Sequence, residues 1–312
     1  MITSLRHNVP LALPVDSSAL VELDRLAVVS APAPAAQIPR LHAQIGRYCV
    51  SLAETPEQRD AACRLRFRVF NLELGEGLES SYRTGLDRDR FDDCCEHLLV
   101  EDALEDNPSR RIVGTYRMQS GATAARHHGY YSEQEFSLAP YKPLRAGILE
   151  LGRACIDRQH RSPEVLTLLW RGIAQYAKDM GLRYLVGCSS INSQDPVEGW
   201  QVYRQLENYR VPPEFKTVPT VAYACPIEQG GAHAQPSPCR SDQSLPESDA
   251  PTPHAPQRKV PKLLRTYLAI GARIAGPPAW DRAFGTIDFL TLLDLKLLSP
   301  SARNRFLAPL TR

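Results

Sequence analysis

The chain has 312 residues, of which 43% are hydrophobic, so it can bury a substantial core in one large or two small domains. Its 37 basic and 35 acidic side chains leave a formal charge of +2, which excludes the broad basic surface that bulk nucleic-acid binding requires. No apolar run approaches the roughly 18 residues that cross a bilayer, and the first residues are unlike a secretory signal. We therefore expect a cytoplasmic protein, free or peripheral on the inner face of the cytoplasmic membrane.

Residues 1–44 mix Ala-Pro repeats with polar residues and have no sustained hydrophobic period, which predicts a mostly disordered N-terminal segment. The compact region then begins with the strand-like run YCVSLA. Thr55, Pro56 and Gln58 predict a capping box at the start of a helix. Two further strands, EHLLVEDA and RRIVGTYRMQ, are expected to pair across a turn.

The stretch from Gly147 to Ser190 predicts a strand, a basic turn, an amphipathic helix and a second strand. Ser162 can cap the helix, Pro163 suits its first position, and Gly181 stands where a left-handed C-terminal cap belongs. A strand-helix-strand unit of this kind implies two parallel strands. The turn RQHRS would present basic side chains and helix N-terminal amides to an anionic group such as a phosphate.

A helix at 197–207 and a strand at 217–227 are expected to complete a mixed central sheet flanked by helices. The compact domain would therefore span residues 45–227. Residues 228–261 are rich in Pro, Ser, Gly and Gln, which predicts a flexible linker. Residues 262–312 form a C-terminal, helical extension, and its basic amphipathic start suits packing either on the core or on an anionic membrane surface.

The eight cysteines show no C-x-x-C pair and no paired histidine spacing, so we expect free thiols and no metal site. Cys155 and Cys188 fall in apolar strands, where core packing is the simpler interpretation. No cysteine or serine has the surroundings of a nucleophile, so a covalent enzyme intermediate is not expected.

The strand-turn-helix-strand unit resembles the core of the GCN5-related N-acetyltransferase (GNAT) superfamily, which holds a phosphopantetheine diphosphate at the equivalent turn. The turn RQHRSP lacks the glycines that are usual there. That departure favours an acyl donor carried on a protein, which has one phosphate instead of the several of coenzyme A. The expected fold is thus an α/β, GNAT-like mixed sheet flanked by helices.

A narrower resemblance rests on several short blocks in order between residues 46 and 225. The blocks are RLRFRVF, DRDRFDDCCEHLLV, IVGTYRM, YYSEQEF, LELGRACI and LLWRGIAQY. They resemble the ornithine-lipid-type, hemolysin-like N-acyltransferases, which are similar to acyl-homoserine-lactone synthases. The resemblance implies transfer of a 3-hydroxylated fatty acyl chain from acyl carrier protein to the α-amino group of ornithine, giving lyso-ornithine lipid. No cofactor would be bound, because the acyl-phosphopantetheine of the carrier is a co-substrate.

Glu150 and Arg153 are the first catalytic candidates. A carboxylate in a hydrophobic strand can have its pKa raised, which suits deprotonation of the acceptor amine. The alternative is a structural pair between the two side chains. In a regular strand they face opposite sides, so they join one site only if a bulge intervenes, and Gly152 is where it can sit.

The resemblance also carries over Arg117 in GTYRM and Asp89 and Asp92 in DRDRFD as groups around a zwitterionic amino acid. Arg68, on the RFRVF helix, is a further carboxylate-binding candidate. Aspartates before a strand also serve as turn and capping residues, which is the alternative for Asp89 and Asp92.

Tyr203 falls where GNAT proteins often supply a tyrosine that protonates the departing thiolate, although its ring also suits core packing. Donor binding and docking of the acidic carrier protein are assigned to a local basic set at the turn and the helix after it. This set consists of Arg158, Arg161, Ser162 and Arg171. An ordinary solvated basic cluster is the alternative.

Two other functions stay open on the sequence alone. The same scaffold can acylate another amine, such as glycine, lysine or the S-adenosylmethionine-type acceptor of the lactone synthases. A protein from a different class, which binds a membrane or a carrier protein without turnover, would also use a basic tail and turn.

Overall fold

The computed structural model describes residues 38–226, 260–298 and 300–306. All of these except Ile38 belong to one compact unit, Pro39–Arg312. Most of the predicted linker, up to residue 259, and most of the predicted N-terminal segment lie outside the described residues, although β1 already begins at His42. Among the described helices, none has the length and apolar character needed to cross a membrane.

A single mixed sheet organises the fold, in the order β1-β2-β3-β4-β5-β6-β9-β7, with β8 also paired to β9. Every neighbouring pair is antiparallel except β5 and β6. The strands are β1 His42–Ile45, β2 Tyr48–Leu52, β3 Glu96–Asp102, β4 Ile112–Ser120, β5 Ile148–Ile156, β6 Tyr184–Ile191, β7 Arg273–Ile274, β8 Ala279–Asp281 and β9 Thr286–Asp294.

Helices cover both faces of the sheet. They are α2 Pro56–Arg66, α3 Pro108–Arg111, α4 Gly121–Arg126, α5 Pro163–Asp179, α6 Pro196–Gln205, α7 Lys262–Ile270 and α8 Pro300–Phe306. Leu98 and Val100 of β3 pack in the core cluster of α5, whereas Leu99 packs in that of α2. Because successive strand side chains face opposite sides, α5 and α2 cover opposite faces.

The predicted helix starts are confirmed. The Thr55 hydroxyl oxygen accepts a hydrogen bond from the Gln58 amide, and the Gln58 side-chain oxygen accepts one from the Thr55 amide. Ser162 caps α5 by accepting from the Val165 amide, and Gly181 follows the helix with φ +66°. The parallel β5-α5-β6 unit is therefore as the sequence predicts.

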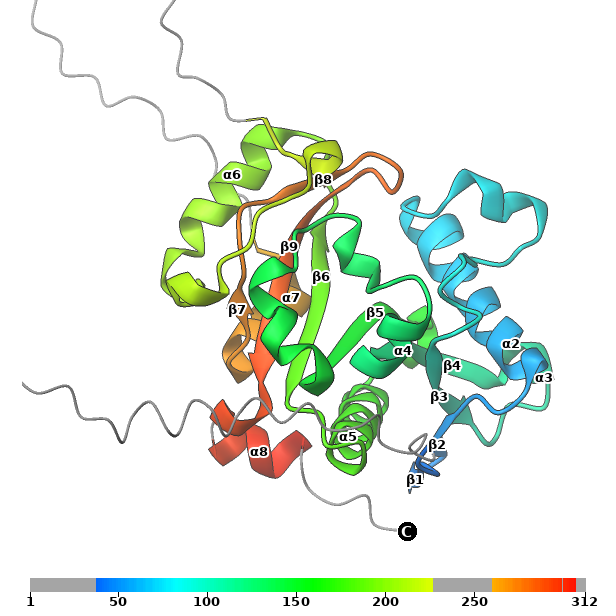
Figure 1. The fold of residues 1–312 in the computed structure, drawn as a ribbon. Coiled ribbons are helices and arrows are strands. Elements are labelled where there is room, and N and C mark those ends of the chain that lie inside the picture. The colour runs from blue at the N-terminus through cyan, green and yellow to red at the C-terminus, as the bar shows by residue number, and fades with distance from the viewer. Residues whose placement is uncertain (1–37, 227–259, 299, 307–312) are drawn as a thin grey trace, which may run out of the picture. The chain divides into compact units, whose positions relative to one another are not determined.

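The strand predicted at 217–227 is wrong. That segment forms a short 3-10 turn, Val221–Tyr223, with isolated bridges at Pro219 and Ala224. Prolines at 219 and 226 cannot donate to a ladder, which explains why a continuous strand fails there. Its place beside β6 is taken by β9, from the C-terminal extension, as Figure 1 shows. The extension is thus helical at α7 and α8 and adds three strands between them.

Strands β5 and β6 pair over only three residues, Ile148–Glu150 with Tyr184–Val186. In the pairing of β5 with β4, Gly152 lies opposite Arg117 and Cys155 lies opposite Thr115. Three steps along β5 therefore match two steps along β4, so β5 carries one extra residue. The bulge predicted near Gly152 is therefore present, and Arg153 adopts φ +49° in it. Beyond residues 150 and 186 the facing edges of the two strands are open to a cavity.

Candidate active site

A cavity of about 320 Å³ occupies the gap between β5 and β6 and reaches α7 and β9. One end is apolar and belongs to the main core cluster. Its walls include Tyr116, Trp170, Leu185, Tyr267, Ala272 and Leu293. The other end is polar, with walls that include Glu76, Arg153, Ser190, Asp281, Thr286 and Asp288. Glu150, the last residue of β5 that pairs with β6, also lines the cavity. The cavity therefore joins titratable side chains at one end to apolar walls at the other.

Glu150 is buried, with 5% of its surface exposed. One carboxylate oxygen accepts a hydrogen bond from the Tyr131 amide at 2.7 Å, and the other accepts from the Ser132 amide at 2.8 Å and from the Ser132 hydroxyl. Burial raises the pKa of Glu150, while these hydrogen bonds and Arg117 lower it, and the pKa stays above its ordinary value. A carboxylate oxygen has two lone pairs, so the oxygen on Tyr131 keeps one for an incoming amine.

Arg153 reaches the same cavity because the bulge redirects its side chain. Its guanidinium lies between the rings of Phe70 and Phe284, 4.3 and 4.7 Å from the centroids. Asp87 accepts from Nε at 3.1 Å and from Nη2. Within the part of the chain that the structure describes, Nη1 has no acceptor, so it is the nitrogen left to bind an anion. The alternative of a Glu150–Arg153 pair is excluded, since Asp87 is the partner.

A buried ion network lies behind Arg153. Arg66 donates to Asp87 at 2.9 Å and to both oxygens of Asp92 at 2.7 and 2.8 Å. Arg117 donates to Asp89 at 2.7 Å and lies 3.3 Å from Asp92. Asp92 also accepts from the Asp89 amide at 2.8 Å. The two guanidiniums hold the pKa of Asp92 well below its usual range against the effect of burial.

His97 borders this network and is fully buried. Its Nε2 donates to the backbone oxygen of Asp92 at 3.3 Å, and burial lowers its pKa to about 4. The unfolded chain binds this proton near pH 6.5, so the folded state loses stability as the pH falls from about 6.5 to about 4.

Between pH 7 and 4.5 the free energy of unfolding of the unchanged protein should fall. We expect this fall to be about 2 kcal/mol smaller in the His97→Gln variant, which keeps a donor but does not titrate. Urea unfolding at the two pH values measures this difference, in which the other titrating groups cancel. Parallel pH dependences for the two proteins would contradict the role given to His97.

The structure brings together most of the residues predicted around the acceptor. Glu150, Arg153 and Arg117 line the cavity, and Asp89 and Asp92 stand behind Arg117 as its partners. Asp89 also accepts from the Phe91 amide, so it serves the turn as well.

Arg68 and Tyr203 lie outside the cavity walls. Arg68 contacts the Ser109 carbonyl and Asp157 at the protein's edge, and the buried arginine of that helix is Arg66. Tyr203 packs edge-on against Trp200 under the Arg210 guanidinium, in a separate core cluster. Nothing in this arrangement brings either side chain to the cavity.

The predicted donor turn is only partly free for an anion. The Ser162 hydroxyl accepts from the Val165 amide, Arg161 pairs with Glu73 at 2.8 Å, and Arg68 faces Asp157. The Glu164 carboxylate lies at the same helix start, where the Ser162 hydroxyl lowers its pKa. Arg158 is exposed and Arg171 half-buried. Much of the positive end of α5 is therefore used internally.

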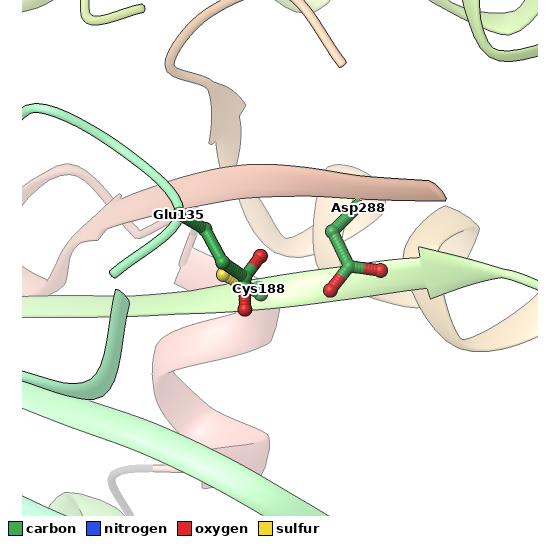
Figure 2. A group of neighbouring side chains, drawn as sticks. All are labelled: Glu135, Cys188 and Asp288. Atoms are coloured by element: carbon green, nitrogen blue, oxygen red, sulfur yellow. The ribbon is translucent and has the colours of Figure 1, made fainter. Parts of the chain in front are cut away.

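The acidic residues at the polar end were not predicted as a site. Figure 2 shows the carboxyl groups of Glu135 and Asp288 turned toward each other beside the Cys188 thiol. Their ligand atoms lie within 4.8 Å of one another, although the residues come from a loop, β9 and β6. Asp281 lies close by on β8, which pairs with β9. No local spacing links the four positions, so only the folded sheet reveals them.

Comparisons with known proteins agree with this geometry. Residues 65–171 match a family model described as an acetyltransferase (GNAT) domain. The L-ornithine N(alpha)-acyltransferase of Brucella abortus (strain 2308) is 31% identical over 263 residues, covering 82% of this chain and 87% of that protein. The enzyme of the same name from Rhizobium meliloti (strain 1021) is 30% identical over 260 residues, covering 82% of each.

Among solved structures, FeeM, an N-acyl amino acid synthase from uncultured soil microbes, is 14% identical with a TM-score of 0.43. The match covers 84% of this chain and 96% of that one. The family model and the relatives confirm the predicted GNAT-like fold and the acyltransferase class. The chain belongs to the L-ornithine N(alpha)-acyltransferase family.

Proposed function

We propose that the protein transfers a 3-hydroxy fatty acyl chain from acyl carrier protein to the α-amino group of L-ornithine. The product is lyso-ornithine lipid, the first intermediate of ornithine lipid biosynthesis. The observation that carries this proposal is the single cavity that joins Glu150 and Arg153 to an apolar channel. The names of the relatives support ornithine as the acceptor. In this proposal the transferase domain consists of residues 45–226 together with the strands of the extension.

The reaction needs a neutral amine and a thioester held together. The Glu150 carboxylate takes a proton from the α-ammonium of the acceptor, and the free amine attacks the thioester carbonyl carbon. A C–N bond forms, the C–S bond breaks, and the second proton that the nitrogen loses as the amide forms passes to the departing thiolate. Cys95 and Cys188 also line the cavity, but burial raises both thiol pKa values, so neither is a ready nucleophile. Direct attack is therefore favoured over an acyl-enzyme.

Arg153 is the residue we assign to the acceptor's carboxylate. Its side chain lines the cavity, and Asp87 and two aromatic rings fix the guanidinium while Nη1 keeps its donors for the acceptor's carboxylate. A cation held in this way loses little side-chain entropy when it binds an anion. Arg117 lies farther back, between the rings of Phe91 and Tyr131, and lowers the pKa of Glu150. We assign it to positioning.

The donor is expected to enter where β5 and β6 part. Leu151–Ile156 and Gly187–Ile191 have no strand partner on their facing edges, so the amides of an extended phosphopantetheine arm can pair with them. The two strands are still close at Gly187, because a side chain there would place its Cβ 2.2 Å from the Leu151 carbonyl oxygen. Arg158, Arg161 and Arg171 remain the basic set that we assign to carrier-protein docking.

The polar groups at the apolar end include the hydroxyls of Tyr116 and Tyr267, which hydrogen-bond to each other. A hydroxyl on the acyl chain can join this pair. We expect Tyr267→Phe to reduce the preference for 3-hydroxyacyl over unsubstituted acyl donors by roughly tenfold, about the value of one buried hydrogen bond. The ratio of kcat/KM for the two donors measures it. Tyr141→Phe removes a buried hydroxyl that donates to Phe215 outside the cavity, so its ratio should not change.

The α7 helix supports peripheral membrane association. Lys262 and Arg265 are exposed, and Leu263 is 44% exposed while also lining the cavity. A basic, partly apolar helix at the mouth of an acyl channel suits an anionic lipid surface that receives the product. Flotation with anionic and with neutral vesicles tests this, since only anionic vesicles should carry the protein.

The function is tested by incubating the protein with 3-hydroxyacyl carrier protein or the matching acyl coenzyme A and a panel of amino acids. Mass spectrometry identifies the acylated products. We expect N-acylornithine with the carrier-protein donor. An acylated glycine or lysine would keep the reaction and change the acceptor. No product with either donor would overturn the enzyme function and favour a non-catalytic binding protein.

A further inference from the structure

The polar end of the cavity contains more acidic groups than its surroundings neutralise. We call Glu135, Asp281 and Asp288, beside the Cys188 thiol, the acidic pocket (Figure 2). All three carboxylates are buried, and Asp281, Asp288 and Cys188 line the cavity directly. The nearest cavity cation, Arg153, already pairs with Asp87. The pocket therefore presents carboxyl groups that no side-chain cation of the cavity pairs with, and a bound cation would favour their charged form.

Glu135 is the most informative member, because it is 1% exposed and aims at Asp288. Neither of its oxygens has a donor in good hydrogen-bond geometry among the described residues, although the Cys188 thiol and the Asp288 carboxyl lie beside them. By contrast, Asp281 accepts from the Ala283 and Phe284 amides, and Asp288 accepts from the Thr286 hydroxyl at 3.0 Å. A buried carboxyl group without donors is costly, so its persistence points to a ligand that supplies them.

The electrostatics of the pocket agree with this geometry. Burial, followed by the neighbouring carboxylates of Asp288 and Asp281, raises the pKa of Glu135 well above its ordinary value. Burial also raises the pKa of Asp288 to about 6. A cation placed among these groups would lower both pKa values again, and the ionised carboxylates would then attract it. An anion at the same place would be repelled.

We propose that the acidic pocket binds the side-chain ammonium of a diamino-acid acceptor, an assignment that rests on the proposed function. An ammonium has three N–H donors and one charge, which matches the undonated oxygens of Glu135 and the carboxylate of Asp288. Its α-amine and α-carboxylate then face Glu150 and Arg153 along the same cavity wall. An ammonium held by carboxylates keeps its proton and is not a nucleophile, so acylation falls on the α-nitrogen.

This pocket would also set the specificity for the acceptor. A site built to hydrogen-bond a polar group rejects an analogue that lacks it, because its own buried groups stay unpartnered. Norvaline has the carbon chain of ornithine without the terminal amine. We expect the unchanged protein to prefer ornithine over norvaline by at least about 10³-fold in kcat/KM.

The test compares kcat/KM for ornithine and norvaline in the unchanged protein and in the Asp288→Asn and Glu135→Gln variants. Both variants should reduce the ornithine-to-norvaline ratio by about 100-fold or more, mainly through a higher KM for ornithine. Turnover of norvaline should persist, which shows that the variants fold. Asp294→Asn is the matched control, because Asp294 lies on the same strand but pairs with Arg183 away from the cavity.

An unchanged ratio in both variants would overturn the ammonium pocket while leaving ornithine acylation intact. A stoichiometric metal ion in the purified protein that Asp288→Asn removes would also overturn it, since the cluster would then be a metal site. If the unchanged protein acylates no amino acid, the proposed function itself fails, and the pocket assignment fails with it.

Discussion

Replacing Asp92 by Asn should lower the free energy of unfolding by about 3–5 kcal/mol, the usual cost of breaking a buried ion pair from one side. Asp92 is completely buried and accepts from both terminal nitrogens of Arg66, and it lies 3.3 Å from Arg117. Asparagine keeps the shape but removes the charge, so two buried guanidiniums would share only Asp87 and Asp89. Urea unfolding at pH 7 measures the loss.

The neighbouring Asp93 provides a matched control. Its side chain is 71% exposed and pairs with Arg88 at the surface. Asp93→Asn should change the free energy of unfolding by about 1 kcal/mol or less, because solvent screens exposed pairs. Equal effects of the two substitutions would contradict the ion network as a main source of stability at this site.

Replacing Glu150 by Gln should lower kcat/KM by roughly 10²- to 10⁴-fold, the range for loss of a general base. Three donors from Tyr131 and Ser132 converge on its two oxygens, so the amide of Gln must place its NH₂ against at least one of them. The variant therefore loses both the proton acceptor and part of the turn that it holds. Steady-state kinetics with a saturating acyl donor measures the effect.

Two further variants separate these contributions. Glu133→Gln disturbs the same turn without touching the cavity, since Glu133 accepts from the Tyr130 amide and pairs with Arg145. It should lose far less activity than Glu150→Gln, and a comparable loss would reduce Glu150 to a structural residue.

Ser132→Ala removes a hydroxyl that lowers the pKa of Glu150. Without it the pKa of Glu150 rises, so the acidic limb of the pH–rate profile should move to higher pH. The profile of kcat/KM against pH measures this shift. An acidic limb that stays in place would exclude Glu150 as the titrating base.

Local signals were enough to predict the centre of the fold. Ser162 and Pro163 at the start of α5, and Gly181 after it, fix a helix between two buried strands, and the bulge at Arg153 follows from requiring Glu150 and Arg153 in one site. These features depend on a few adjacent residues, for which the backbone geometry is nearly unique.

Features that depend on distant segments were not predictable in the same way. The apolar run that forms β9 fits a buried helix as well as a strand, and only pairing with β6 decides between them. Arg66 lies four residues after Ala62, on the buried face of α2, but the carboxylates that allow an arginine to be buried there, Asp87 and Asp92, come from a later loop. The acidic pocket likewise needs three segments brought together.

The position of the new amide bond shows which of the two amines of ornithine the protein acylates. The protein is incubated with 3-hydroxyacyl carrier protein and ornithine labelled with ¹⁵N at the α-nitrogen, and the product is examined by NMR. We expect an amide signal from the labelled α-nitrogen, because Glu150 activates that amine while the acidic pocket holds the other one protonated. A product acylated at the side-chain nitrogen would contradict both assignments.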